Sequence, residues 1–306
     1  MRILVLGAGG LGGYFGGRLA RAGVDVTFQV RPRRAAQIAA NGLVVTSPLG
    51  DFSLPVKTVQ RDTVRPGFDA ILFSCKAYDL DDAIDSIRPA AAGARIVPVL
   101  NGLKHLPALD AAFGAELVLG GTGLIGASLD PDGTVRHLNR SHGLVFGARA
   151  PGQAAFCEAL EAALAPGGFD SRNSPAIMQE MWEKFVFLCT LASATTLFRT
   201  NTGAINRTDN GGSVIRDLLA ECEAAATAAG HPSRAKAGEN ARTWLLDPAS
   251  GNAASMMRDM LAGGPVEADH IVGDMLSRAT AAGSPAPMLR AAYVNLQAYQ
   301  TARAAT

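Results

Sequence analysis

The feature that most constrains the fold is a glycine-rich segment close to the N-terminus. Residues 7–12 read Gly-Ala-Gly-Gly-Leu-Gly, after an apolar run, Ile3 to Leu6, and at the start of a helical pattern, Leu11 to Ala22. A G-x-G-x-x-G between a strand and a helix allows a tight turn, a close approach of the backbone to a pyrophosphate, and close helix–strand packing. The free N–H groups of the helix N-terminus favour the anion. The expected cofactor-binding residues are Gly7, Ala8, Gly9, Gly10, Leu11 and Gly12.

Short apolar runs alternate with helical patterns in the first half of the chain. This alternation predicts a parallel sheet with helices on both faces, and therefore an α/β fold. The expected strands are Ile3–Leu6, Val24–Val30, Ala70–Ser74 and Ile96–Leu100, with helices at Leu11–Ala22 and Asp79–Ile87. Residues 43–56 predict a hairpin that turns at Leu49 to Asp51. A second strand-rich stretch, residues 117–146 with a turn at Pro131 to Gly133, is expected to complete the same sheet with antiparallel strands.

The pattern changes near Pro175. Beyond it, Ala, Leu, Met, Glu and Arg recur at helical spacing, and glycine or proline breaks separate the segments. The chain of 306 residues is long enough for two domains. We therefore predict an α/β domain over residues 1–174 and an all-α domain over residues 175–306. The apolar run from Phe185 to Phe198 predicts a buried core helix.

Composition excludes several classes of function. The 28 Lys and Arg residues balance 27 Asp and Glu residues, so no bulk field attracts nucleic acid or an anionic membrane. The longest apolar run is shorter than the roughly 20 residues that span a bilayer. Four separated cysteines indicate neither a disulfide framework nor a zinc site, which favours a reducing cytoplasmic location. No metal is expected, and His137 and His142 are predicted to have surface or turn roles. The helical half could supply a homodimer face as easily as it packs internally.

Three arginines follow the second predicted strand. Val30 precedes Arg31, Pro32, Arg33 and Arg34, and neither Asp nor Glu is present there. An acidic residue at this place bonds the ribose 2′-hydroxyl of NAD, whereas arginine accommodates the 2′-phosphate of NADP. The segment therefore favours NADP(H) as the cofactor, with a solvated basic loop as the alternative.

Other polar residues stand where parallel sheets bind ligands or where chemistry could occur. Lys76 and Asn101 follow the third and fourth parallel strands at their carboxyl ends. Lys184 precedes the long apolar run, where it could reach water or, partly desolvated, donate a proton to a developing alkoxide. Ser255 and Glu267 flank a break at residues 263–265, and either could be an ordinary surface residue.

Taken together, these motifs resemble the ketopantoate reductases, also called 2-dehydropantoate 2-reductases. The resemblance covers nearly the whole chain and is carried by these segments: GAGGLG, Arg31, CKAYD with Lys76, LNG with Asn101, WEKFVF with Lys184, SMMRD with Ser255 and VEAD with Glu267. It implies a Rossmann-like domain followed by a helical domain. It also implies NADPH-dependent reduction of 2-dehydropantoate to (R)-pantoate, in pantothenate biosynthesis.

The resemblance assigns a role to each matched residue. Lys184 would donate the proton, and Glu267 would bind substrate and support the lysine electrostatically. Asn101 and Lys76 would contact cofactor and substrate, Ser255 would bond the substrate, and Ala127, expected just after a strand over residues 118–125, would line the cofactor cleft.

Three positions depart from the family pattern. Family members carry asparagine where this chain has Leu188, Ala192 and Thr202, although Asn201 could substitute for the third if the turn shifts. A site without these amides suits a related 2-oxo acid that is less polar than ketopantoate.

Two other classes of protein fit parts of the pattern. A 3-hydroxyacid dehydrogenase also pairs a Rossmann domain with a helical domain, but it has an asparagine four residues after its lysine and a G-x-x-G-x-G before it, and this chain has neither. A non-catalytic NADP(H)-binding regulatory protein is favoured by the missing amides and opposed by Lys184, Ser255 and Glu267.

Overall fold

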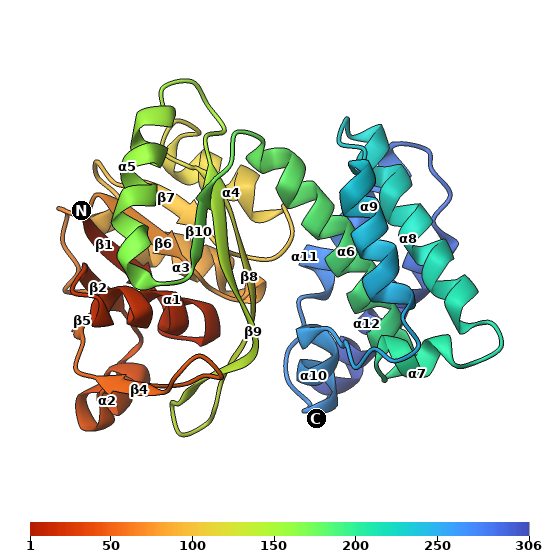
Figure 1. Ribbon diagram of the computed structural model, residues 1–306, viewed down its shortest axis with the longest axis horizontal. Coiled ribbons are helices and arrows are strands. Elements are labelled where there is room, and N and C mark those ends of the chain that lie inside the picture. The colour runs from red at the N-terminus through yellow and green to blue at the C-terminus, as the bar shows by residue number, and fades with distance from the viewer. Residues whose placement is uncertain (306) are drawn as a thin grey trace. The chain divides into compact units, whose positions relative to one another are not determined.

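The computed structural model of the protein describes residues 1–305, which form two compact units (Figure 1). The first unit comprises residues 1–100 and 105–178, and the second comprises residues 101–104 and the chain from residue 179 onward. The division falls four residues after the boundary predicted at residue 174. The short loop 101–104, predicted within the first domain, belongs to the helical unit.

A five-stranded parallel sheet forms the centre of the first unit, in the order β5-β2-β1-β6-β7. Its strands are β1 (Arg2–Leu6), β2 (Asp25–Gln29), β5 (Lys57–Val59), β6 (Ala70–Phe73) and β7 (Arg95–Pro98). Leu6 at the end of β1 lies opposite Gln29 of β2 and Phe73 of β6. The carboxyl ends of three strands therefore meet at one edge, and the glycine-rich segment starts there. The α/β fold class and the four predicted strands are confirmed.

Helices connect the strands of this unit. They are α1 (Gly10–Arg21), α2 (Pro32–Asn41), α3 (Leu80–Ile87), α4 (His105–Phe113) and α5 (Ala154–Leu164), with short 3₁₀ turns η1 (Ala77–Asp79), η2 (Arg88–Ala90) and η3 (Ala165–Gly167). Helix α2 was not predicted, because it is short, begins at a proline and buries only Ile38 of its residues. Arg31 is its N-cap and Pro32 its first residue, a position that tolerates proline because the missing N–H would have no helical partner. The arginine segment is thus the start of a helix and not the solvated loop that was the alternative interpretation.

The predicted strands after residue 117 build a second sheet and do not complete the first. The sheet runs β10-β9-β3-β4, with β8 paired to β9. Its strands are β3 (Leu43–Thr46), β4 (Phe52–Leu54), β8 (Gly120–Leu129), β9 (Val135–Gly147) and β10 (Asp170–Asn173). Both predicted hairpins form, since β3 pairs with β4 and β8 with β9 in antiparallel register. A single bridge between Ile96 and Val118 joins this region to β7.

Helix α1 packs against both sheets. A Cβ on Gly16 would lie 2.7 Å from the Phe28 ring of the first sheet, and one on Gly13 would lie 2.6 Å from Val135 of the second. Tyr14 and Phe15 are fully buried beside these glycines. The absence of side chains on two faces of α1 lets both sheets approach its backbone, which explains why glycines continue beyond the six-residue motif.

The second unit is helical throughout its described part. Its helices are α6 (Ile177–Phe198), α7 (Thr202–Asn206), α8 (Gly211–Ala228), α9 (Ala235–Leu246), α10 (Ser255–Leu261), α11 (Ala268–Ala281) and α12 (Pro287–Ala304). Helix α6 contains the predicted core helix. Its buried hydroxyls are satisfied inside the helix, because Thr190, Thr195 and Thr196 each donate a hydrogen bond to the carbonyl four residues before. Within residues 1–305, no helix is long and apolar enough to cross a membrane.

Candidate active site

The glycine-rich segment has the geometry that a bound pyrophosphate requires. Gly7 has φ of +84°, and a Cβ there would lie 2.8 Å from the Ser74 carbonyl oxygen. A Cβ on Gly12 would collide with the Gly7 carbonyl oxygen. Gly9 is the N-cap of α1 and leaves the helix end without a side-chain cap. A Cβ on Gly9 would have no neighbouring heavy atom within 4 Å. A helix N-terminus without a side-chain cap suits a phosphate pair, so the residues present fit a dinucleotide.

The other residues predicted to bind the cofactor, Ala8, Gly10, Leu11 and Ala127, lie in or beside the glycine-rich segment. A Cβ on Gly10 would lie 2.9 Å from the carbonyl oxygen of Ala127, so the backbone of β8 approaches the start of α1 closely. Ala127 is inside β8, beside a bulge after Ile125, and the prediction that the strand ends before it is wrong. The Ala8 carbonyl accepts a hydrogen bond from Arg34 Nε at 3.0 Å. Leu11 is partly buried against the core.

The three predicted arginines do not form a free cationic cluster. Arg34 donates to backbone carbonyl oxygens, from Nε to Ala8 and from Nη1 to Gly133 at 2.7 Å, and burial lowers its pKa. It therefore holds the glycine-rich segment against the β8–β9 turn. Arg33 is exposed on α2. The grouping of all three guanidiniums around one phosphate is wrong, because Arg34 is bonded to backbone carbonyls and Arg33, the residue before it on the helix, points in a different direction.

Arg31 belongs to a group of four charged residues, which we call the charge cluster: Arg31, Arg61, Asp79 and Asp82. Arg31 Nη2 lies 3.1 Å from Asp79 Oδ1 and 3.1 Å from Asp82 Oδ2. Arg61 Nη1 lies 2.7 Å from Asp82 Oδ1. Hydrogen bonding to Asp79, and then to Asp82, raises the pKa of Arg31. The cluster thus contains two cations and two carboxylates, and its formal charge is zero.

Lys76 lies at the carboxyl edge of the parallel sheet. It directly precedes η1 as its N-cap and is partly buried. The strand before it, β6, neighbours β1, so Lys76 starts from the same sheet edge as the glycine-rich segment.

In the helical unit, Lys184 and Asn101 are brought together although 83 residues separate them. Lys184 Nζ donates a hydrogen bond to Asn101 Oδ1 at 3.2 Å. Lys184 lies in the second turn of α6 and is partly buried, and burial lowers its pKa from the ordinary 10.5 to about 8. An ammonium with a pKa near neutrality is suited to give up a proton during a reaction.

His270 supports this pair and was not predicted. It lies on α11, is 6% exposed, and makes a hydrogen bond with the backbone of Asn101. Burial, followed by the charge of Lys104, lowers the pKa of His270 to about 4. The ring is therefore neutral at physiological pH, so it can fix the Asn101 loop without adding charge near Lys184. No short motif marks such a histidine, because its partner is a backbone group distant in sequence.

Ser255 and Glu267 occupy helix starts. Ser255 is the first residue of α10, after Ala254, whose N–H donates to Thr195 Oγ1 on α6 at 3.4 Å. Glu267 is the N-cap of α11, is 9% exposed, and its carbonyl accepts from Ile271 N at 3.1 Å. Both residues are thus fixed at the start of a helix, and Glu267 is buried, so Glu267 is not an ordinary surface residue.

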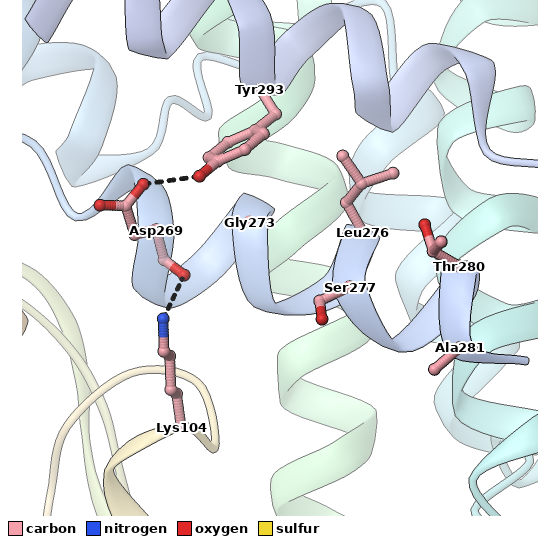
Figure 2. Close-up of a pocket in the computed structure, with 8 residues that line it drawn as sticks. All are labelled: Lys104, Asp269, Gly273, Leu276, Ser277, Thr280, Ala281 and Tyr293. Atoms are coloured by element: carbon pink, nitrogen blue, oxygen red, sulfur yellow. Dashed lines mark hydrogen bonds between the residues drawn. The ribbon is translucent and has the colours of Figure 1, made fainter.

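An open surface pocket of about 600 Å³ lies along α11 (Figure 2). Tyr293 Oη donates to Asp269 Oδ1 at 2.8 Å, and Lys104 Nζ donates to the Asp269 carbonyl at 3.5 Å. Ser277 and Thr280 line it farther along the same helix. None of these residues was predicted. Asp269 is two residues after Glu267, so these contacts fix the turn from which the Glu267 side chain starts.

The three positions that depart from the family pattern are apolar or already engaged. Leu188 and Ala192 follow Lys184 by one and two turns on α6, and Ala192 is fully buried. Thr202 is buried, and its hydroxyl donates to Ser250 Oγ at 3.1 Å. Asn201 accepts a hydrogen bond from Ala204 N at 2.8 Å and caps α7. The Asn201 oxygen is therefore used by the fold.

The histidine pair has a different place from the one predicted. His137 is 3% exposed on β9, so a surface or turn role is wrong for it. His137 Nδ1 is hydrogen-bonded to Ser47 Oγ and His142 Nδ1 to Tyr14 Oη, each at 2.9 Å. His142 therefore ties α1 to the second sheet, and His137 ties β9 to the turn between β3 and β4. Across residues 1–305, no group of three or more His, Cys, Asp or Glu side chains is arranged to hold a metal ion.

The fold and these sites define a class, an oxidoreductase with a dinucleotide-binding α/β unit and a helical unit that carries a lysine of lowered pKa. Family models agree. Residues 3–151 match the ketopantoate reductase PanE/ApbA family and residues 176–300 match its C-terminal domain. The chain belongs to this family of nicotinamide-dependent oxidoreductases, and its Rossmann-like first unit and helical second unit have the expected architecture.

Individual relatives cover nearly the whole chain. An uncharacterized oxidoreductase, YkpB of Bacillus subtilis, is 35% identical over 98% of this chain and 99% of its own. The 2-dehydropantoate 2-reductase of Halobacterium salinarum is 27% identical over 95% of this chain and 96% of its own. The crystal structure of 2-dehydropantoate 2-reductase from Geobacter metallireducens has a TM-score of 0.89 and 29% identity, over 97% of this chain and 99% of its own.

Proposed function

We propose that the protein reduces a 2-oxo acid to a 2-hydroxy acid with NADPH, and that its substrate is 2-dehydropantoate, reduced to (R)-pantoate in pantothenate biosynthesis. The observation that carries this proposal is the Lys184–Asn101 pair, a partly buried ammonium held at 3.2 Å by an amide oxygen. Similarity to 2-dehydropantoate 2-reductases over nearly the whole chain supports the substrate class.

Lys184 has the chemistry that ketone reduction requires. Bound NADPH would supply the hydride to the carbonyl carbon. Negative charge then develops on the carbonyl oxygen, and the Lys184 ammonium both stabilises this charge and donates the proton. Asn101 accepts from the ammonium and so restrains its direction.

Glu267 and Ser255 are proposed to bind the substrate, and Glu267 is also proposed to stabilise the charged form of Lys184. Gly7 to Gly12, with Ala127 and Lys76, are proposed to bind the cofactor.

A second substrate class is favoured by Leu188 and Ala192. Two apolar side chains on the Lys184 face of α6 cannot bond a substrate hydroxyl, and a site without such partners loses little affinity for a substrate that lacks the hydroxyl. The alternative substrate is a less polar 2-oxo acid.

The deciding experiment measures kcat/KM for a panel of 2-oxo acids, including 2-dehydropantoate, with NADPH and with NADH. We expect turnover of at least one 2-oxo acid, with 2-dehydropantoate preferred. A higher value for an aliphatic or aromatic 2-oxo acid would support the second class. Measurable binding of NADPH without oxidation by any acid would support a non-catalytic regulatory protein.

Lys184→Ala tests the proposed proton donor with the best acid of that panel. We expect kcat to fall by roughly 10²–10⁴, the range of general acid catalysis. Lys236→Ala, at an exposed position of α9, is the matched control and should keep wild-type kcat. Near-wild-type turnover by the Lys184 variant would contradict its role.

A further inference from the structure

The charge cluster carries an inference about cofactor choice. We propose that Asp79, assisted by Asp82, determines cofactor specificity by limiting the preference of Arg31 for a 2′-phosphate and by offering an acceptor to a ribose 2′-hydroxyl. This inference rests on the proposed binding of a nicotinamide dinucleotide, but not on the proposed substrate.

Topology places Asp79 where a nucleotide ribose is expected. Arg31 follows β2 by two residues, and Asp79 ends η1, which follows β6. These strands lie on either side of β1, and the glycine-rich segment starts at the end of β1. The two side chains meet at 3.1 Å, so they reach toward each other at the carboxyl edge of the sheet. Ligands of such sheets bind at this edge.

The acidic residue that the sequence lacks after β2 is thus supplied from β6. In dinucleotide sites an acidic side chain accepts a hydrogen bond from the ribose 2′-hydroxyl and repels a 2′-phosphate. Asp79 has this chemistry, and its side chain is 35% exposed, so it can meet a ligand. The residues directly after the second strand do not reveal Asp79, because Asp79 lies 48 residues after Arg31 in the sequence.

Charge balance decides between the two cofactors. Arg31 alone would attract a phosphate dianion, but each of its two carboxylate partners adds repulsion at a similar distance. Asp82 is also paired with Arg61 at 2.7 Å, so part of its charge is already compensated. Asp79 therefore has the larger effect. For one charge about 5 Å from a phosphate dianion in a water-like medium, Coulomb's law gives roughly a tenfold change in affinity.

The test measures dissociation constants of NADP⁺ and NAD⁺ by isothermal titration calorimetry, at low salt, on the full chain. Asp79→Asn keeps the size of the side chain and removes its charge. We expect the affinity ratio of NADP⁺ to NAD⁺ to rise about tenfold, chiefly through tighter NADP⁺. Asp82→Asn should raise the ratio by less, and Arg31→Ala should lower it. Added salt should shrink all three effects.

Asp85→Asn is the matched control, because Asp85 lies on α3, like Asp82, and is paired with an arginine, Arg88, at 3.0 Å, outside the charge cluster. It should leave the ratio unchanged. An Asp79→Asn ratio within twofold of wild type, equal changes in Asp85→Asn, or failure of wild type to bind either nucleotide would each overturn the proposal. If both nucleotides bind as expected but no 2-oxo acid is turned over, the proposed reaction fails while the specificity role of Asp79 stands.

Discussion

At the residue scale, three side chains from distant parts of the sequence make one arrangement. Lys184 donates to the Asn101 side chain, and His270 bonds the Asn101 backbone. The buried histidine is neutral, so it orients the loop without repelling the ammonium. A lysine with a lowered pKa and a fixed direction is more useful as an acid than one free in solvent.

Lys184 should set the alkaline limb of the pH profile. Its pKa of about 8 means that the ammonium is lost as pH rises through 8, and the proton for the alkoxide is lost with it. We therefore expect kcat/KM for 2-oxo acid reduction to fall tenfold per pH unit above about pH 8. The oxidation of the 2-hydroxy acid needs the neutral amine and should rise over the same range. A reductive profile that stays flat to pH 10 would contradict this assignment.

At the element scale, helix α1 combines two requirements on its glycines. Some glycines leave space for a ligand, and others let neighbouring backbone atoms approach the helix closely. A Cβ on Gly9 would lie in open space, whereas a Cβ on Gly12 would collide with the Gly7 carbonyl oxygen and the Ser74 hydroxyl. The same residue type in one motif thus has separable roles.

Substitution by alanine should separate these two roles. Gly12→Ala forces the strand-to-helix turn apart and should lower the free energy of unfolding by about 1–3 kcal/mol, as overpacking does. In Gly9→Ala the new methyl meets no neighbour and the backbone φ is negative, so the free energy of unfolding should stay within about 0.5 kcal/mol of wild type. The dinucleotide affinity should fall, because the methyl would lie where the pyrophosphate is expected to approach the backbone. Urea denaturation and calorimetric titration measure the two effects. Equal loss of stability in both variants would contradict the division.

At the scale of the whole molecule, two units with separate cores need not unfold together. The two tryptophans, Trp182 and Trp244, lie on α6 and α9 of the helical unit, so intrinsic fluorescence reports that unit selectively. Tryptophan fluorescence can therefore measure the effect of His270 on the stability of the helical unit.

The helical unit should lose stability in mild acid because of His270. The pKa is about 4 in the folded protein and near the ordinary 6.5 when unfolded, so between these values the unfolded chain binds more protons. The contribution of neutral His270 to the free energy of unfolding is present above pH 6.5 and is lost as pH falls toward 4. The total loss is about 3 kcal/mol. Urea unfolding followed by tryptophan fluorescence from pH 7 to 4 measures it. His270→Gln, which cannot be protonated, should show a shallower pH dependence; an unchanged slope would contradict the assignment.

Much of the architecture could be predicted from local patterns. The strand, glycine turn and helix at residues 3–22 have a strong period and steric signature, so they were located almost to the residue. The hairpins were predicted because turn chemistry is local. Which sheet they join was not, since strand pairing is a contact between distant segments. Helix α2 was missed because it is short, begins at a proline and buries only one residue.

The sequence by itself determined the α/β and helical halves, the dinucleotide turn and the identity of the candidate acid, Lys184, because these depend on local sterics and residue chemistry. Tertiary structure alone decided what surrounds them. Arg34 turns inward to carbonyl groups, Arg31 meets Asp79 across β1, and His270 reaches the Asn101 loop. Direction and partnership of side chains follow from packing between segments far apart in the chain, and no local pattern specifies them.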